Sequence, residues 1–135
     1  MALNTKLSST VVNAQANVLA ELLNAGYLSI YDGNQPASAD EAVTNQKLLA
    51  RLKFGDPAFK NAVDGTIRAT EIKKEPNAKA TGKATWSRCY MLDNKTSLLD
   101  GSVGTKNSNL VLKSVEVQKG SEVSVLSFQH TVPKQ

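Results

Sequence analysis

The chain has 135 residues, a formal net charge of +4 and a hydrophobic content of 41%, of which few residues are aromatic. This length is typical of one domain, and it is sufficient to bury a core without a disulfide or a metal ion. Cys89 is the single cysteine and His130 the single histidine, which excludes an internal disulfide, a cysteine-rich zinc site and a histidine-based metal centre. No segment approaches the roughly 20 apolar residues that cross a bilayer, so no membrane partner is expected.

The N-terminal part predicts an extended arm followed by one helix. Met1–Leu7 is expected to form the arm, and it lacks the apolar stretch of a secretory signal, so we expect synthesis in the cytoplasm. A helix is predicted over Ser9–Asn24, because hydroxyl side chains precede it and Gly26 favours its end. Its buried face is expected to comprise Val12, Ala16, Leu19 and Leu23, broadened by Val11, Val18 and Leu22, with Asn13, Gln15, Asn17, Glu21 and Asn24 on the polar side. The helix is expected to lie across one face or one end of the sheet, and the alternative is packing on a neighbouring protein.

The remainder predicts strands separated by turn signals. Tyr27–Tyr31 is a predicted strand, Asn34–Gln46 a long surface loop, and Lys47–Phe54 a half-buried strand. In the last of these, Leu48, Ala50, Leu52 and Phe54 are expected to face inward, and Lys47, Leu49, Arg51 and Lys53 to form a basic outer face. Further strands are predicted over Gly65–Ile72, Gly82–Leu92, Ser97–Val103, Asn109–Val117 and Glu122–Val132.

These elements predict a mainly β protein: a single domain over residues 8–135, built as an antiparallel β-sandwich of jelly-roll or immunoglobulin-like type with one N-terminal α-helix. The last strand changes phase, which predicts a bulge near Val125 and Leu126. Trp86 is expected to be a core residue surrounded by Ala84, Cys89 and Met91, with Arg88 at the margin of the core.

The residues that catalysis needs are sparse. His130 lies in a predicted strand and Cys89 in an apolar one, so neither is expected to act as a base or nucleophile. No glycine-rich phosphate loop opens a helix, and Asp32, Asp40 and Glu41 lack the spacing of a calcium loop. We therefore expect no enzyme activity, no cofactor and no metal, and the modest charge favours no nucleic-acid partner.

Several segments nevertheless occur together in an order that resembles a known family. They are Tyr27–Ala37, Thr81–Arg88, Asp100–Gly104, Asn109–Leu112 and Val123–Pro133. In this order they resemble small, mostly β virion proteins encoded by tailed bacteriophages and prophages, and the resemblance extends from about Leu7 to Pro133. The matching residues are turn and core residues, and this chain is richer in lysine than such sequences usually are.

The resemblance implies a structural component of the virion, assembled in the cytoplasm of the bacterial host. The first expectation is a capsid decoration (cement) protein that binds the lattice of the major capsid protein. The alternative is a neck or tail component bound to other virion proteins, and homo-oligomers are compatible with either. A rival of another class is a free-standing binding module for nucleic acid or carbohydrate.

The partner interface is expected to include Leu3 and Leu7. Both are apolar residues outside the helix stripe, on an arm too short to fold alone. Burial on a partner would explain them, and the alternative is that they pack on their own sheet.

Overall fold

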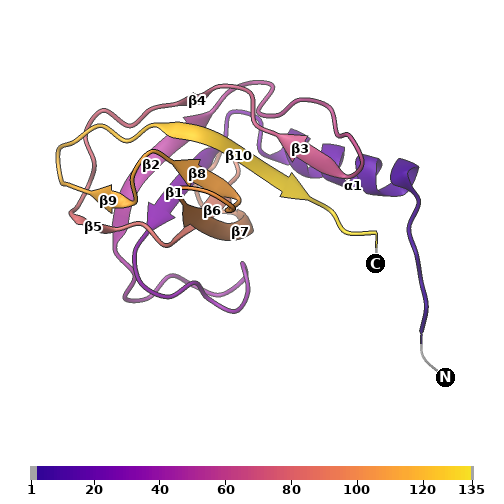
Figure 1. The fold of residues 1–135 in the computed structure, drawn as a ribbon, viewed down its shortest axis with the longest axis horizontal. Helices are drawn as coiled ribbons and strands as arrows, with labels where there is room; N and C mark the ends of the chain where they lie inside the picture. The colour runs from indigo at the N-terminus through magenta and orange to yellow at the C-terminus, as the bar shows by residue number, and fades with distance from the viewer. Residues whose placement is uncertain (1–2, 135) are drawn as a thin grey trace.

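The computed structural model describes residues 3–134 of the chain. Its single helix, α1, covers Ser9–Leu22 and lies at one end of a curled sheet (Figure 1). The Ser8 side chain caps the helix by accepting a hydrogen bond from the Val11 N–H at 3.3 Å. At the other end Gly26 donates to the Leu23 carbonyl, and any larger residue there would collide with the Tyr90 carbonyl. The predicted helix is confirmed, and it ends two residues earlier than expected.

Eight strands form one sheet in the order β3-β10-β8-β7-β6-β1-β2-β4, and β5 and β9 form a separate pair. Their bounds are β1 Tyr27–Tyr31, β2 Leu48–Phe54, β3 Thr66–Arg68, β4 Ile72–Lys73, β5 Gly82–Lys83, β6 Trp86–Tyr90, β7 Ser97–Gly104, β8 Leu110–Leu112, β9 Glu116–Val117 and β10 Val125–Thr131. The mainly β class with one helix is therefore confirmed.

The expectation of a purely antiparallel sheet is wrong, because β7 and β8 pair in parallel through Val103 and Gly104. The chain between them makes a loop instead of a hairpin, and Asn107 in this loop has a positive φ of 52°. The Asn109 side chain stabilises the loop: its Oδ1 accepts from both the backbone N–H and the hydroxyl of Ser102 at 3.2 Å. The turn residues in the sequence did not show whether this segment forms a loop between parallel strands or a hairpin between antiparallel strands. The jelly-roll or immunoglobulin-like type stays a prediction.

The sheet curls so far that its two end strands, β3 and β4, belong to one continuous segment of the chain. β3 bonds to β10, β4 bonds to β2, and only residues 69–71 separate β3 from β4. The Ala69 N–H donates to the Phe128 carbonyl at 2.9 Å, and Glu75 pairs with Val123 beyond β4. Residues 66–75 therefore connect both ends of the sheet, which leaves neither end as a long open edge.

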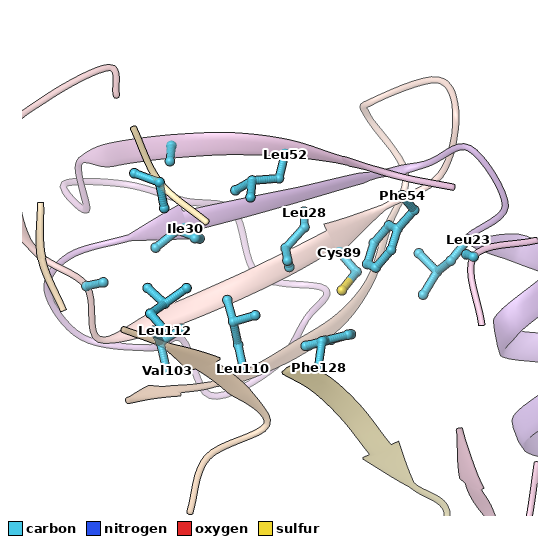
Figure 2. Packing of buried hydrophobic residues seen from close by; sticks show 14 of the residues in the cluster. Leu23, Leu28, Ile30, Leu52, Phe54, Cys89, Val103, Leu110, Leu112 and Phe128 are labelled. Carbon is cyan, nitrogen blue, oxygen red and sulfur yellow. The ribbon is translucent and has the colours of Figure 1, made fainter. Parts of the chain in front are cut away.

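The core lies inside this curl, where side chains from facing strands point toward one another (Figure 2). Leu28 and Ile30 of β1 meet Leu110 of β8 and the thiol of Cys89 there. Three phenylalanines pack where the ends of the sheet meet, with ring centroids 5.4–5.9 Å apart: Phe54, Phe59 and Phe128.

Two irregularities set which residues face the core. In β2 the register skips Leu49, since Ile30 pairs with Ala50 and Tyr31 with Leu48. Leu49 is fully buried beneath Gly82, so its expected place on the basic outer face is wrong. In β10 the register skips Leu126, which confirms the predicted bulge and leaves that side chain exposed.

The phenylalanine cluster predicts a large difference between two neighbouring positions of β10. Phe128→Ala should lower the free energy of unfolding by about 3–5 kcal/mol, because it removes buried contacts and leaves a cavity. Leu126→Ala, on the exposed bulge, should change it by less than about 0.5 kcal/mol. Urea denaturation measures both. Equal losses at the two positions would contradict the packing described here.

The turn between β6 and β7 predicts an acid titration. The Asp93 carboxylate accepts from the hydroxyl and N–H of Thr96 and from the N–H of Lys95, which lowers its pKa from 3.8 to about 2. Because this pKa lies below the unfolded value, the stabilisation is present above pH 3.8 and is lost as the pH falls toward 2. Carboxyl-carbon NMR should give a midpoint near 2 in the native protein and a higher one in Thr96→Val. A native midpoint at the ordinary value would contradict these bonds.

Candidate partner-binding surface

Three asparagines of the helical region determine which side of α1 faces the body. The side-chain oxygens of Asn13, Asn17 and Asn24 accept hydrogen bonds from the backbone N–H groups of Gly65, Ala62 and Ala58 at 2.6–2.9 Å. The expectation that these asparagines lie on a solvent-facing side is wrong. The segment from residue 58 to 65 is mostly irregular, so its N–H groups need acceptors, and the helix supplies them.

The side of α1 turned away from the body carries apolar side chains. Val12 and Ala16 are buried, whereas Val11, Val18 and Leu22 are 41%, 58% and 41% exposed. The last three were expected to broaden the buried stripe, and that expectation is wrong because the asparagine contacts rotate them outward. Their spacing places them along one side of the helix. We call these three residues the outer helix stripe.

The arm before the helix separates the two residues predicted to contact a partner. Leu3 is 97% exposed, and Figure 1 shows the arm leading away from the body. Leu7 is half-buried, and its N–H donates to the Lys134 carbonyl at 2.7 Å. Beside this contact Asp64 accepts from the Ser9 hydroxyl and pairs with Lys134, and both lower the pKa of Asp64. The arm is thus held to the body near Leu7, and Leu3 extends beyond it.

A second surface lies on the outside of the sheet, opposite the core. The alternation of the strands places on it the aromatic, hydroxyl and charged residues of four neighbouring strands. We call this surface the outer sheet face; it comprises Tyr27, Ser29, Tyr31, Arg51, Lys53, Trp86, Arg88, Tyr90 and Asp100. The Lys53 ammonium lies 4.4 Å from the centre of the Tyr27 ring and donates to the Ala25 carbonyl.

Arg88 holds the long loop against this face. It is only 3% exposed, and its Nε and Nη2 donate to the two carboxylate oxygens of Asp100 at 2.7 and 2.9 Å. Its Nη1 and Nη2 also donate to the carbonyls of Glu41 and Ser38. The expected position of Arg88 at a core margin is therefore wrong: it is buried outside the sheet, beneath residues 34–46.

Trp86 is fully buried, as expected, but its surroundings differ from those predicted. Its ring stacks on Tyr31 at 4.6 Å and its Nε1 donates to the Asp32 carbonyl. Cys89 belongs to the core on the opposite side of the sheet, because neighbouring strand residues point to opposite faces. Tyr31 and Arg88 therefore lie against the ring of the single tryptophan.

The titratable groups of the core offer little chemistry. Burial raises the pKa of the Cys89 thiol, and it lowers the pKa of the half-buried His130. Within residues 3–134 no group of three or more histidine, cysteine or acidic side chains is arranged to hold a metal ion. Over the same residues, no helix is long and apolar enough to span a membrane.

Comparison with family models, with curated proteins and with solved structures gave no match.

The buried ion pair predicts that Asp100 is critical for the loop. Asp100→Asn should cost about 3–5 kcal/mol, since it leaves the Arg88 charge buried without its partner. It should also accelerate proteolysis within residues 34–46, because the same guanidinium bonds to that loop. Asp40→Asn, an exposed change in the loop itself, is the control and should be near neutral. This role would be contradicted if Asp100→Asn lost little stability and was cleaved within residues 34–46 no faster than the intact protein.

Proposed function

We propose that the protein is a non-enzymatic structural component of a bacteriophage virion that docks on a repeating protein surface. Capsid decoration on the major capsid lattice is the first position proposed, and a neck or tail position is the second. The sequence resemblance supports the class of protein. The observation that carries the docking is Leu3, which lies almost fully exposed on an arm leading away from the body.

The exposed apolar residues suit attachment to a lattice. Full burial of one valine or leucine side chain contributes about 1.5–3 kcal/mol, and the outer helix stripe supplies three partly exposed ones besides Leu3. Ordering the arm opposes this by about 1–2 kcal/mol per residue fixed, so each copy binds weakly. Repeated contacts on one particle, or association of copies with one another, turn weak binding into stable attachment.

The rival, a free-standing module for nucleic acid or carbohydrate, has less support. Such modules stack a base or sugar on exposed aromatic rings, and Trp86 is fully buried. Among residues 3–134 the exposed large apolar side chains are all aliphatic, and four of the seven lie on the arm and helix, which favours a protein partner.

Docking predicts that charges introduced on the arm and helix reduce incorporation without unfolding the protein. Leu3→Asp and Val18→Asp should each lower the amount found in purified particles by about tenfold or more, because an aspartate in an apolar contact loses its hydration. Quantitative mass spectrometry of particles from the encoding phage, complemented with each variant, measures this. Gln118→Asp, on an exposed polar position after β9 and outside the arm and helix, is the control.

Deletion of residues 1–6 extends the same test, since it spares Leu7 and its contact with the C-terminal segment. The thermal midpoint should remain within a few degrees of the intact protein while incorporation falls. Particles that contain none of the intact protein would contradict the proposed function.

A further inference from the structure

The segment that closes the curled sheet leaves a gap beside β10. Residues 66–75 run along this strand (Figure 1) and are bonded to its side of the sheet at separate places. The Ala69 N–H donates to the Phe128 carbonyl at 2.9 Å, and Glu75 and Val123 exchange backbone bonds at 2.8 and 2.9 Å. Between these contacts the segment turns away from β10 to pair with β2. A surface hollow of about 220 Å³ lies in the gap, and we call it the β10 hollow.

The β10 hollow combines apolar walls with two cations. Half-buried Ile72 and Val125 line it from opposite sides of the gap. The exposed Lys60 and Arg68 line it as well, and a 2.9 Å bond from the Lys60 N–H to the Arg68 carbonyl holds their backbones together. Within residues 3–134, no acidic residue lines the hollow and neither cation forms an ion pair. The fold therefore leaves this positive charge uncompensated.

The bulge in β10 adds an exposed leucine to the same hollow. Leu126 lines it and is 64% exposed, because the pairing with β8 skips this residue. Single exposed leucines are ordinary on protein surfaces and need no explanation by themselves. This one adjoins half-buried apolar walls and two unpaired cations, so the hollow has an apolar part and a charged part next to each other.

This combination determines the chemistry of an occupant. The hollow is smaller than the roughly 300–1,000 Å³ that is typical of sites for small molecules, and its size suits one inserted side chain. A carboxylate matches the guanidinium of Arg68, which offers it a two-point contact. A nucleic-acid backbone would satisfy the cations but would leave the apolar walls and Leu126 without an apolar partner. An acidic peptide segment that also carries an aliphatic side chain satisfies both parts.

We propose that the β10 hollow binds an acidic segment of the protein partner. Carboxylates of that segment pair with Lys60 and Arg68, while a neighbouring aliphatic side chain packs on Leu126 and enters the gap. That the partner is a virion protein rests on the proposed function, whereas the preference for an acidic peptide rests on the residues of this chain. The hollow thus supplies a charged contact in addition to the apolar ones of the arm and helix.

The site is tested first on the purified full-length protein, with the blocked peptide acetyl-Glu-Glu-Leu-Glu-Glu-amide as the probe. The backbone amide NMR signals of Thr70 and Ser127, which line the hollow, should shift and saturate as the peptide is added. A peptide with glutamine in place of each glutamate should bind at least about fivefold more weakly, because it loses both charge pairs. Added salt should weaken the acidic peptide more than the neutral one.

Matched variants of the protein separate this site from general attraction to a basic chain. Arg68→Gln and Lys95→Gln each remove one exposed positive charge, and only the first should weaken the peptide, by about threefold. Leu126→Ala and Leu92→Ala shorten leucines that are 64% and 61% exposed, and again only the first should weaken it, by about threefold or more. All four substitutions are at exposed positions and should leave the NMR spectrum native.

Four outcomes would overturn the peptide site. These are no saturable shift at the lining residues, equal binding of the glutamine peptide, equal weakening by the matched control variants, and tighter binding of a ten-nucleotide oligothymidylate to the same residues at equal ionic strength. The last outcome would indicate a nucleic-acid site in place of a protein-binding one.

A second experiment tests the partner in assembled particles. Arg68→Glu should reduce incorporation about tenfold, because it places a negative charge against the acidic segment, while Lys95→Glu should not. If the intact protein enters particles and Arg68→Glu enters equally, the acidic contact with the partner is wrong and the proposed function stands. If the intact protein enters no particles but the peptide still saturates the hollow, the proposed function fails and the peptide site stands.

Discussion

The structure depends on the segment from residue 66 to 75, which hydrogen-bonds to both ends of the sheet. Its first part pairs with β10 and its later part with β2, so one short stretch of backbone closes the curl. The three packed phenylalanines lie at this position and resist its opening. Because unpaired strand edges invite association with other chains, the closure also removes the two ends of the eight-stranded sheet as sites for such pairing.

Closing the sheet separates an apolar inside from a polar outside. The inside holds aliphatic side chains, the three phenylalanines and one buried thiol, whereas the outside holds Trp86, tyrosines and guanidinium groups, with Arg88 under the loop. A buried ion pair such as Arg88 with Asp100 adds little net stability compared with apolar packing, because both charges lose hydration. Its value here is positional, since the same guanidinium fixes the course of the loop through two backbone carbonyls.

Local signals in the sequence predicted much of the fold. The capped helix and the bulge in β10 follow from residue types and phase, and both are confirmed. The predictions that failed depend on contacts between distant segments. Leu49 lies in a bulge that only its pairing with β1 creates, and the asparagines of α1 turn inward because an irregular segment 34–52 residues away needs acceptors. The outer sheet face was likewise missed, although the alternation of Tyr27, Ser29 and Tyr31 against Leu28 and Ile30 already marked a strand with two different faces.

The asparagine contacts of α1 have a consequence for how this surface can change during evolution. Each contact uses only a side-chain oxygen, and each donor is a main-chain N–H group. An aspartate at the same position would keep the acceptor, and the three hydrogen bonds themselves do not involve the side chains of the donor residues. The flank of the helix can therefore exchange neutral for negative groups while the path of the backbone is preserved. In the facing segment, Phe59 in the core and Gly65, where a side chain would collide with the Val132 carbonyl, limit such exchange. The charge along this flank can thus change without a new fold.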